Sequence, residues 1–175
     1  MLDNLYTRRS IRKYKSAKID QSTVQVLLKA ALLSPSSRGR QPWEFIVVED
    51  AGVLEQLSNA KMGAGHLKSA ALGIVICTNS TISDVWVEDA SIAATILHLT
   101  ANSLGLGSCW IQIRERQYTE AMTAEQYVQE VLKIPVHIKV VAIISIGYPD
   151  ESKLPHTDNT LRFDKIYRNK YGSIL

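Results

Sequence analysis

The sequence lacks the motifs of several large enzyme classes. It contains neither G-x-x-x-x-G-K-[ST] nor G-x-G-x-x-G, which excludes a P-loop and the dinucleotide-binding fingerprint. The four histidines are scattered without metal-ligand spacing, and no pair of nucleophile and base can be read from the order of residues. The sequence therefore gives no support for a metal site or for Ser/His/Asp chemistry.

Cysteine and long apolar runs are also scarce. Cys77 and Cys109 stand on apolar segments without C-x-x-C spacing, which is typical of reduced core residues in a cytoplasmic protein. No apolar h-region follows Met1, and the longest apolar stretch, 136–147, is interrupted by polar residues. We therefore expect a cytoplasmic protein without a signal peptide or a membrane span.

Charge of one sign is not in large excess over the whole chain. The formal net charge is only +3, which argues against a general nucleic-acid coat protein. With 175 residues and 46% hydrophobic composition, the chain can bury one sizeable core. We expect residues 1–175 to form a single domain.

Hydrophobic periodicity predicts alternating helices and strands, and hence an α/β or α+β architecture. Helices are expected at 20–34, from 50 onward, at 87–104 and at 123–133, and strands at 43–50, 71–78, 107–114 and 138–148. The helix at 87–104 is apolar on nearly every side and closes with Gly105 as a left-handed cap. This pattern predicts that the helix is buried in the core or against a partner.

The segment from Asp150 onward differs in composition from the rest of the chain. It is polar, and its main apolar side chains are Phe163, Tyr167 and Tyr171. A spacing of four residues predicts a narrow aromatic seam. Such a seam is suited to docking on another surface.

A basic segment lies close to the amino terminus, in the stretch LYTRRSIRKY. Arg8, Arg9, Arg12 and Lys13 fall within six positions and surround Ser10. Like charges this close repel, so the segment is either a solvated helix end or a site for an anion. Arginine offers phosphate oxygens a planar fork of donors, and Ser10 adds a hydroxyl, so phosphate is the anion that would fit.

Two further stretches allow a functional and a purely structural interpretation. LSPSSRGRQPWEF, at 33–45, is a turn rich in donors ahead of a strand, or only a helix-to-strand connection. In LGLGSCWIQ, at 104–112, two glycines let the backbone approach a flat ligand, or pack a sheet corner. His98, on the apolar helix, is expected to be a hydrogen-bonded core residue.

Taken together, these stretches resemble the FMN-dependent nitroreductase family. The resemblance rests on RRSIR, SPSSRGRQPWEFIVV, DASIAATILHLTANSLGLGSCWIQIR and KVVAIISIGYP, in this order and spacing, and covers nearly the whole chain. It implies an α+β fold, with a mixed, largely antiparallel sheet between helical layers. It also implies an intertwined homodimer with shared FMN sites, in which the tail, residues 150–175, docks on the partner subunit.

The resemblance also implies roles for individual residues. Arg8, Arg9 and Ser10 would hold the FMN phosphate and ribityl chain, and Arg12 would lie beside the flavin pyrimidine edge. The loop residues that would reach the flavin of the other subunit are Pro35, Ser36, Ser37 and Gln41. The strand residues that would face the ring are Cys109, Trp110, Ile111 and Gln112, with the Gln112 N–H aimed at N5.

Two details depart from the family pattern. Gly39 stands where many members carry an asparagine, which puts one contact across the subunits in doubt. Arg114 and Arg162 compete for the role of a basic phosphate ligand that many members carry near the carboxyl terminus.

The function implied is an oxidoreductase in which NAD(P)H reduces FMN and an electron-poor acceptor, such as a nitroaromatic or a quinone, takes the electrons. The flavin supplies the reactive chemistry, so no catalytic acid or base and no metal is expected. Alternatives are a non-enzymatic flavin-binding or redox-sensing module and a basic nucleic-acid-binding domain. Within the family, dehalogenating and flavin-cleaving activities stay open as alternatives, although the extra lid segments that they would need are not evident in this chain. The sequence decides neither the acceptor nor NADH against NADPH.

Overall fold

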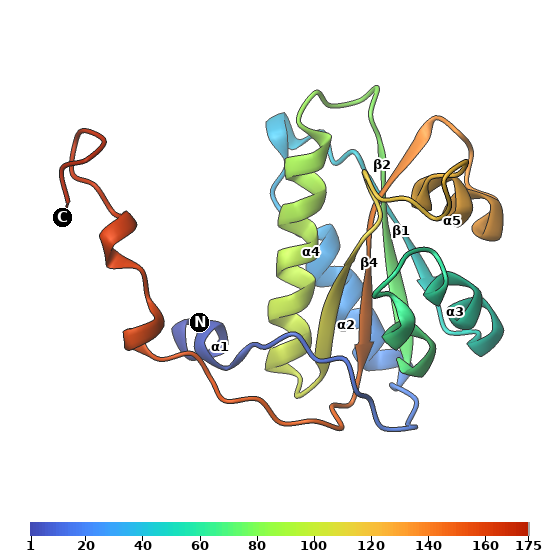
Figure 1. The fold of residues 1–175 in the computed structure, drawn as a ribbon, viewed down its shortest axis with the longest axis horizontal. Helices are drawn as coiled ribbons and strands as arrows, with labels where there is room; N and C mark the ends of the chain where they lie inside the picture. The colour runs from blue at the N-terminus through green and yellow to red at the C-terminus, as the bar shows by residue number, and fades with distance from the viewer. Residues whose placement is uncertain (175) are drawn as a thin grey trace.

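The computed structural model describes residues 1–174 as three layers, with one sheet between two groups of helices (Figure 1). The strands are β1 (Trp43–Val48), β2 (Leu72–Asn79), β3 (Gly107–Gln112) and β4 (Ile138–Gly147), in the spatial order β1-β2-β4-β3. All three neighbouring pairs are antiparallel. A mixed sheet was predicted, but the one parallel pairing among residues 1–174 is an isolated bridge between Ser10 and Ser108. It forms because the short segment after the first helix runs along β3 in the same direction.

The four longer α-helices of residues 1–174 lie where the hydrophobic periodicity predicts them, and the short helix at the amino terminus was not predicted. The α-helices are α1 (Leu2–Thr7), α2 (Gln21–Leu32), α3 (Ala51–Ser58), α4 (Trp86–Ser103) and α5 (Ala124–Leu132). Short 3-10 turns are η1 (Ser37–Gly39), η2 (Gly65–Ser69), η3 (Asp158–Thr160) and η4 (Phe163–Lys165). Side chains cap three of these helices at their start: Asp20 and Asp50 each accept a main-chain N–H, and Thr123 and Gln126 form a capping box.

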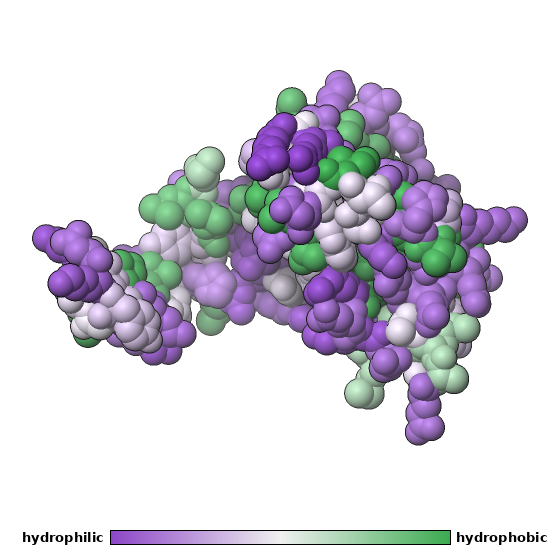
Figure 2. All heavy atoms as spheres, turned by 90° about the horizontal axis from the view of Figure 1, so that it is seen from above, coloured by the Kyte–Doolittle hydropathy of each residue, from purple (hydrophilic) through white to green (hydrophobic). Residues whose placement is uncertain are grey.

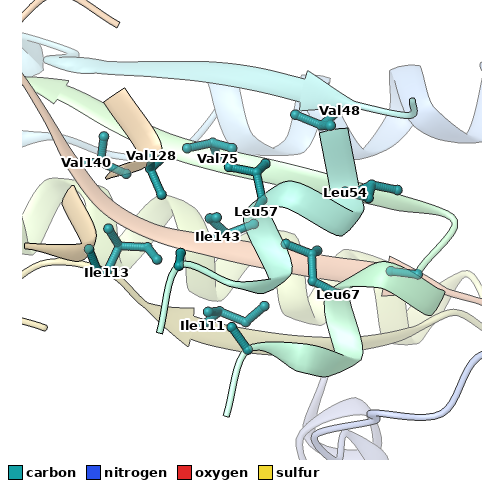
Figure 3. Close-up of a cluster of buried hydrophobic side chains, with 14 of the residues drawn as sticks. Val48, Leu54, Leu57, Leu67, Val75, Ile111, Ile113, Val128, Val140 and Ile143 are labelled. Atoms are coloured by element: carbon teal, nitrogen blue, oxygen red, sulfur yellow. The ribbon is translucent and has the colours of Figure 1, made fainter. Parts of the chain in front are cut away.

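A hydrophobic core lies on each face of the sheet. α2 and α4 cover one face, and α3, η2 and α5 cover the other (Figure 1). Figure 3 shows the second core, in which Leu57 and Leu67 pack toward Val75 and Ile143 of the central strands. β2 and β4 are buried on both faces because each lies between two helical layers, as the continuous apolar run at 71–78 predicts for β2.

Helix α4 is buried in the core along one face, so the prediction of burial in the core or against a partner is met in part within one chain. Its inner face, with Ala90, Ala94 and Leu97, is fully buried against the sheet. Its outer face keeps apolar residues in solvent, since the side chain of Ile92 is 39% exposed. Gly105 follows with φ +74°, which confirms the left-handed cap.

The tail leaves the body of the molecule (Figure 1), and every residue from Leu154 to Ile174 is exposed. Hydrophobic side chains lie open on this projecting part (Figure 2). The predicted aromatic seam is only partly formed: the rings of Tyr167 and Tyr171 lie 4.7 Å apart, but Phe163 sits apart on η4. No helix aligns the three rings, since no other part of residues 1–174 buries this stretch.

Candidate functional site

The basic segment, residues 8–12, lies along the free edge of β3. The Ile11 N–H donates to the Ser108 carbonyl at 3.0 Å, beside the bridge between Ser10 and Ser108. The close approach requires a glycine on the strand, because a Cβ at Gly107 would lie 2.7 Å from the Ile11 side chain. Gly107 therefore sets how near the basic segment lies to the sheet.

Tyr14 fastens the far end of this segment. Its hydroxyl donates to the Ile11 carbonyl at 2.6 Å and lies 2.8 Å from the Ser145 hydroxyl. Burial raises the pKa of Tyr14, so the phenol stays protonated. A Cβ at Gly147 would meet the Tyr14 ring at 2.8 Å, so this glycine leaves room for the clamp.

The arginines of the basic segment have no acidic counterparts. Arg8, Arg9 and Arg12 form no ion pair within residues 1–174. The Arg9 guanidinium donates to the Leu154 carbonyl, and the Arg12 main-chain N–H donates to the Glu151 carboxylate at 2.5 Å. Three guanidinium groups that lie along one short segment and form no ion pair favour the binding of an anion.

Lys153 is a basic residue of this site that the sequence did not reveal. Its ammonium donates to the Ser10 carbonyl and lies 3.4 Å from the Glu151 carboxylate. The pKa of Glu151 is lowered, chiefly because its carboxylate accepts the Arg12 N–H. Nothing in the sequence marks this contact, because it joins the polar tail to a segment more than 140 residues away.

The two arginines considered as phosphate ligands lie elsewhere in the chain. Arg114 pairs with Glu115 at 2.6 Å, and its guanidinium lies 5.6 Å from the centre of the Trp86 ring. Arg162 forms two hydrogen bonds with Asp164 on the exposed tail, at 2.8 and 2.6 Å. Within residues 1–174, Lys153 is hydrogen-bonded to the basic segment, and Arg114 and Arg162 are not.

Strand β3 offers its main chain to a ligand more readily than its side chains. Because the Ser108 carbonyl points to the free edge, the alternation of a strand points the N–H groups of Trp110 and Gln112 there as well. The Trp110 indole donates to the Gln112 side chain at 2.9 Å, which in turn donates to the Arg114 carbonyl at 2.8 Å. The side chains of Cys109 and Ile111 are buried. The outward Gln112 N–H agrees with the role that the family resemblance implies.

His66, on η2, is a partly buried residue that the sequence pattern does not single out. Its Nε2 is buried without a hydrogen-bond partner among residues 1–174. Burial lowers the pKa of His66, and the nearby Arg12 guanidinium lowers it further. Burial raises the pKa of the Cys109 thiol, which Arg12 opposes, so Arg12 lies close to both residues. The Nε2 of His66 has no access to solvent in one chain, so the nitrogen lies beneath the surface that a ligand would contact.

His98 is confirmed as a hydrogen-bonded residue of the core. Its Nδ1 lies 2.7 Å from the Ser108 hydroxyl, and burial, aided by the Arg8 charge, lowers its pKa to about 4. No carboxylate among residues 1–174 is hydrogen-bonded to this ring to orient it, and the serine is 2% exposed. The pair therefore holds α4 to β3 rather than forming a nucleophile and its base.

The loop at residues 35–41 is sharply bent. Arg38, Gly39 and Gln41 have φ of 53°, 65° and 48°, and the Gln41 N–H donates to the Ser36 hydroxyl at 2.9 Å. A Cβ at Gly39 would meet nothing within 4 Å. Asparagine, which tolerates the left-handed region, would therefore fit at this position, so glycine here keeps the backbone shape that an asparagine would have.

The loop and the basic segment lie at opposite ends of helix α4. The Ser37 N–H donates to Asp89, in the first turn, at 2.8 Å. Thr7, next to the basic segment, accepts from Asn102, near the last turn, at 3.0 Å. The 13 residues between Asp89 and Asn102 span about 20 Å along the helix axis. One chain thus keeps the two predicted parts of the site well apart.

The groove that lies next to the basic segment is small in one chain. A groove of about 200 Å³ next to the basic segment is lined by Arg9, Gly107 and Lys153, among others. Cofactor pockets typically measure about 300–1,000 Å³, so one chain supplies only part of such a pocket. A groove of about 500 Å³, lined by residues that include Lys15 and Lys68, contains none of the predicted site residues.

Two other kinds of site receive no support from residues 1–174. No three histidine, cysteine, aspartate or glutamate side chains in this range gather as a metal site would require. None of the helices in it is both long enough and apolar enough to cross a membrane.

A comparison with known protein families identifies the family of this chain. The sequence profile of the Nitroreductase family matches residues 5–79 and 61–148. The chain belongs to the Nitroreductase family. As a member of this family, the protein is an oxidoreductase.

Two curated relatives and a solved structure share nearly the full length. A protein of Archaeoglobus fulgidus with the provisional name NADH dehydrogenase/NAD(P)H nitroreductase is 39% identical, over 97% of this chain and 98% of its own. A protein of Methanothermobacter thermautotrophicus with the same provisional name is 31% identical, over 98% and 87%. The structure of an FMN-dependent nitroreductase from Clostridium difficile R20291 is 47% identical, covers 98% of this chain and 100% of its own, and superposes with a TM-score of 0.96.

Proposed function

We propose that this protein is an FMN-dependent oxidoreductase that carries electrons from NAD(P)H to an electron-poor acceptor such as a nitroaromatic or a quinone. The observation that carries the proposal is the set of three arginines without ion pairs along the edge of β3, next to outward main-chain N–H groups. The names of the full-length relatives and the solved structure support the choice of cofactor and co-substrate. Bound FMN would supply the redox chemistry, by accepting hydride from NAD(P)H and passing it to the acceptor.

The residues of this chain fit the two polar ends of such a cofactor. Arg8, Arg9 and Ser10, joined by Lys153, provide donors for a phosphate. Arg12 would face the polar edge of the ring. The Gln112 N–H would lie beside the reacting edge, so the chain binds and orients while no side chain need move a proton.

We further propose that the working unit is a homodimer with two shared sites. The loop at 35–41 lies about 20 Å along α4 from the basic segment, so a second copy is the simplest source of a loop for each site. The exposed Ile92 on α4 and the uncovered tail are apolar surfaces that such a partner would bury. The tail of each chain would dock on the other.

Titration with FMN and with riboflavin tests the phosphate site. Wild-type protein should bind FMN and appear yellow, and Arg8→Ala should weaken FMN binding about 10- to 150-fold, the value of about 1.5–3 kcal/mol for a charge-assisted contact. Riboflavin affinity should hardly change in Arg8→Ala, because riboflavin has no phosphate. Lys15→Ala, which removes a cation facing the other groove, is the matched control.

Three outcomes would contradict parts of this proposal. Equal wild-type affinity for riboflavin and FMN would remove the phosphate role of Arg8. A yellow protein that does not oxidise NADH or NADPH with any acceptor would favour the non-enzymatic flavin-binding module. A colourless protein with salt-sensitive binding of DNA or RNA would favour the nucleic-acid-binding domain.

A further inference from the structure

Asp89 is a buried carboxylate outside the set of residues assigned to the cofactor. It lies in the first turn of α4 and is 2% exposed. One oxygen accepts the Ser37 N–H at 2.8 Å, and the other accepts the Ser83 hydroxyl at 3.0 Å. Asp89 forms no ion pair within residues 1–174, so these two donors and the amino end of the helix stabilise its charge.

The loop that Asp89 contacts needs an external support. Three of its residues, Arg38, Gly39 and Gln41, have left-handed φ, a region that costs a non-glycine residue energy. Arg40 makes the other contacts between the loop and the segment before α4. Its guanidinium donates to the Ile82 carbonyl at 3.1 Å and lies 3.9 Å from the Asp84 carboxylate at the surface. The contact from Asp89 is the buried one, and it reaches the main chain in the middle of the loop.

We infer that Asp89 is a positioning residue, which holds the loop at 35–41 in the shape that contacts the flavin bound by the partner subunit. This inference rests on the proposed function. Asp89 acts on the cofactor indirectly, through its hydrogen bond with the Ser37 N–H. This contact lies at one end of α4, and the basic segment of the same chain lies at the other end. Loss of Asp89 should therefore damage the site that the partner's Arg8 builds and spare the site that its own Arg8 builds.

Mixed dimers test this crossed effect through FMN binding. Arg8→Ala and Asp89→Ala chains are combined under conditions that let subunits exchange, and bound FMN is counted by fluorescence titration. In the heterodimer one site collects both lesions and the other collects neither, so half of the sites should bind FMN with wild-type affinity. The pair Arg8→Ala with Ser37→Trp, a direct loop lesion, should behave in the same way.

The two pairs separate this inference from the proposal beneath it. If the Ser37→Trp pair recovers tight sites and the Asp89→Ala pair does not, Asp89 acts within its own subunit and the inference is wrong. If neither pair recovers a site, the shared-site dimer itself is wrong. If wild-type protein binds no FMN, the proposed function fails.

Homodimers of single variants test the same contact without relying on one substitution. Asp89→Ala should weaken FMN and riboflavin binding by the same factor, about tenfold, because the phosphate contacts are intact. The visible spectrum of the bound flavin should shift with it. Asp89→Asn keeps an oxygen for the Ser37 N–H and should restore both affinity and spectrum. Glu88→Ala, which removes the exposed acid next along the same turn, is the matched control and should leave both unchanged.

Removal of the donor provides a second route if Asp89→Ala does not fold. Ser37→Pro deletes the N–H, and the extended backbone of Ser36, at φ −138° and ψ 158°, accommodates a following proline. Ser37→Ala keeps the N–H and serves as the reference. Weaker flavin binding in Ser37→Pro than in Ser37→Ala supports the inference, and equal binding in the two variants overturns it.

Discussion

The basic segment and the loop at 35–41 are held in place by different means. The basic segment is extended, and its supports come from distant parts of the sequence: β3 through Ile11, and the start of the tail through Lys153. The loop is sharply bent, and its buried support comes from one carboxylate on α4. The first region keeps its arginines without ion pairs, whereas two main-chain donors of the second, the N–H groups of Ser37 and Gln41, are already satisfied by Asp89 and Ser36.

This difference indicates which part of a ligand each region suits. Unpaired cations repel one another until an anion arrives, so the basic segment suits a charged group. A loop whose bend is fixed by Asp89 and Ser36 suits contact by shape with an uncharged surface. FMN has both a charged end and a flat ring, which is why the two regions fit one ligand although one chain holds them at opposite ends of a helix.

Removal of the tail should have the largest effect on this arrangement. A chain truncated after Pro155 keeps Lys153 but loses the exposed apolar residues of η4 and the following turn. Full-length protein should scatter light as a dimer at micromolar concentration, and the truncated chain should be a monomer that binds FMN weakly, because the partner's loop is missing. Lys170→Ala, an exposed tail variant, should remain dimeric. A truncated chain that stays dimeric, or full-length protein that is monomeric, would contradict the proposed docking of the tail.

Gly107→Ala should displace the basic segment without touching the loop. The new Cβ would lie 2.7 Å from Ile11, and overpacking of this kind costs about 1–3 kcal/mol. We expect FMN affinity to fall about 5- to 150-fold in a titration. Gly65→Ala, where a Cβ meets nothing within 4 Å, is the control. Unchanged affinity in Gly107→Ala would show that the basic segment is not held by this approach.

Arg12→Ala should change the redox potential more than the affinity. A fixed cation favours the redox form of a cofactor that carries more negative charge, so its loss should lower the midpoint potential of bound FMN. A loss of about 1–2 kcal/mol corresponds to roughly 20–40 mV for a two-electron couple. Spectroelectrochemistry measures this shift, with Lys15→Ala as a control of equal charge. An unchanged potential would remove Arg12 from the polar edge of the ring.

His98→Gln should have the smallest effect, confined to mildly acidic pH. The pKa of His98 in the folded protein is about 4, below its ordinary value of 6.5. Between these values the unfolded chain binds a proton that the folded chain does not, so wild-type stability should be full above pH 6.5 and should decrease toward pH 4. Urea unfolding at several pH values should show a shallower decrease in His98→Gln. Parallel curves for the two proteins would show that His98 is protonated equally in both states.

Much of the fold could be predicted from local signals. Asp20, Asp50 and the Thr123/Gln126 box mark helix starts because a capping side chain acts within three residues of its own position. The buried character of β2 is visible in its continuous apolar run. The outer face of α4 stays exposed in one chain, because an apolar pattern indicates that a face must be covered but not which chain covers it.

The sequence by itself determined the helices, the strands and the stretches that carry the family resemblance, since these depend on periodicity and on short-range order. Only the tertiary structure brought Lys153 to Ser10, left His66 without a partner beside Arg12, and placed Asp89 under the loop. These contacts join residues from about 50 to more than 140 positions apart, and a carboxylate or a lysine looks the same in sequence whether it is solvated or buried against a distant main chain. The physical reason is that a contact of this kind is set by how the layers pack, and packing depends on all the elements at once.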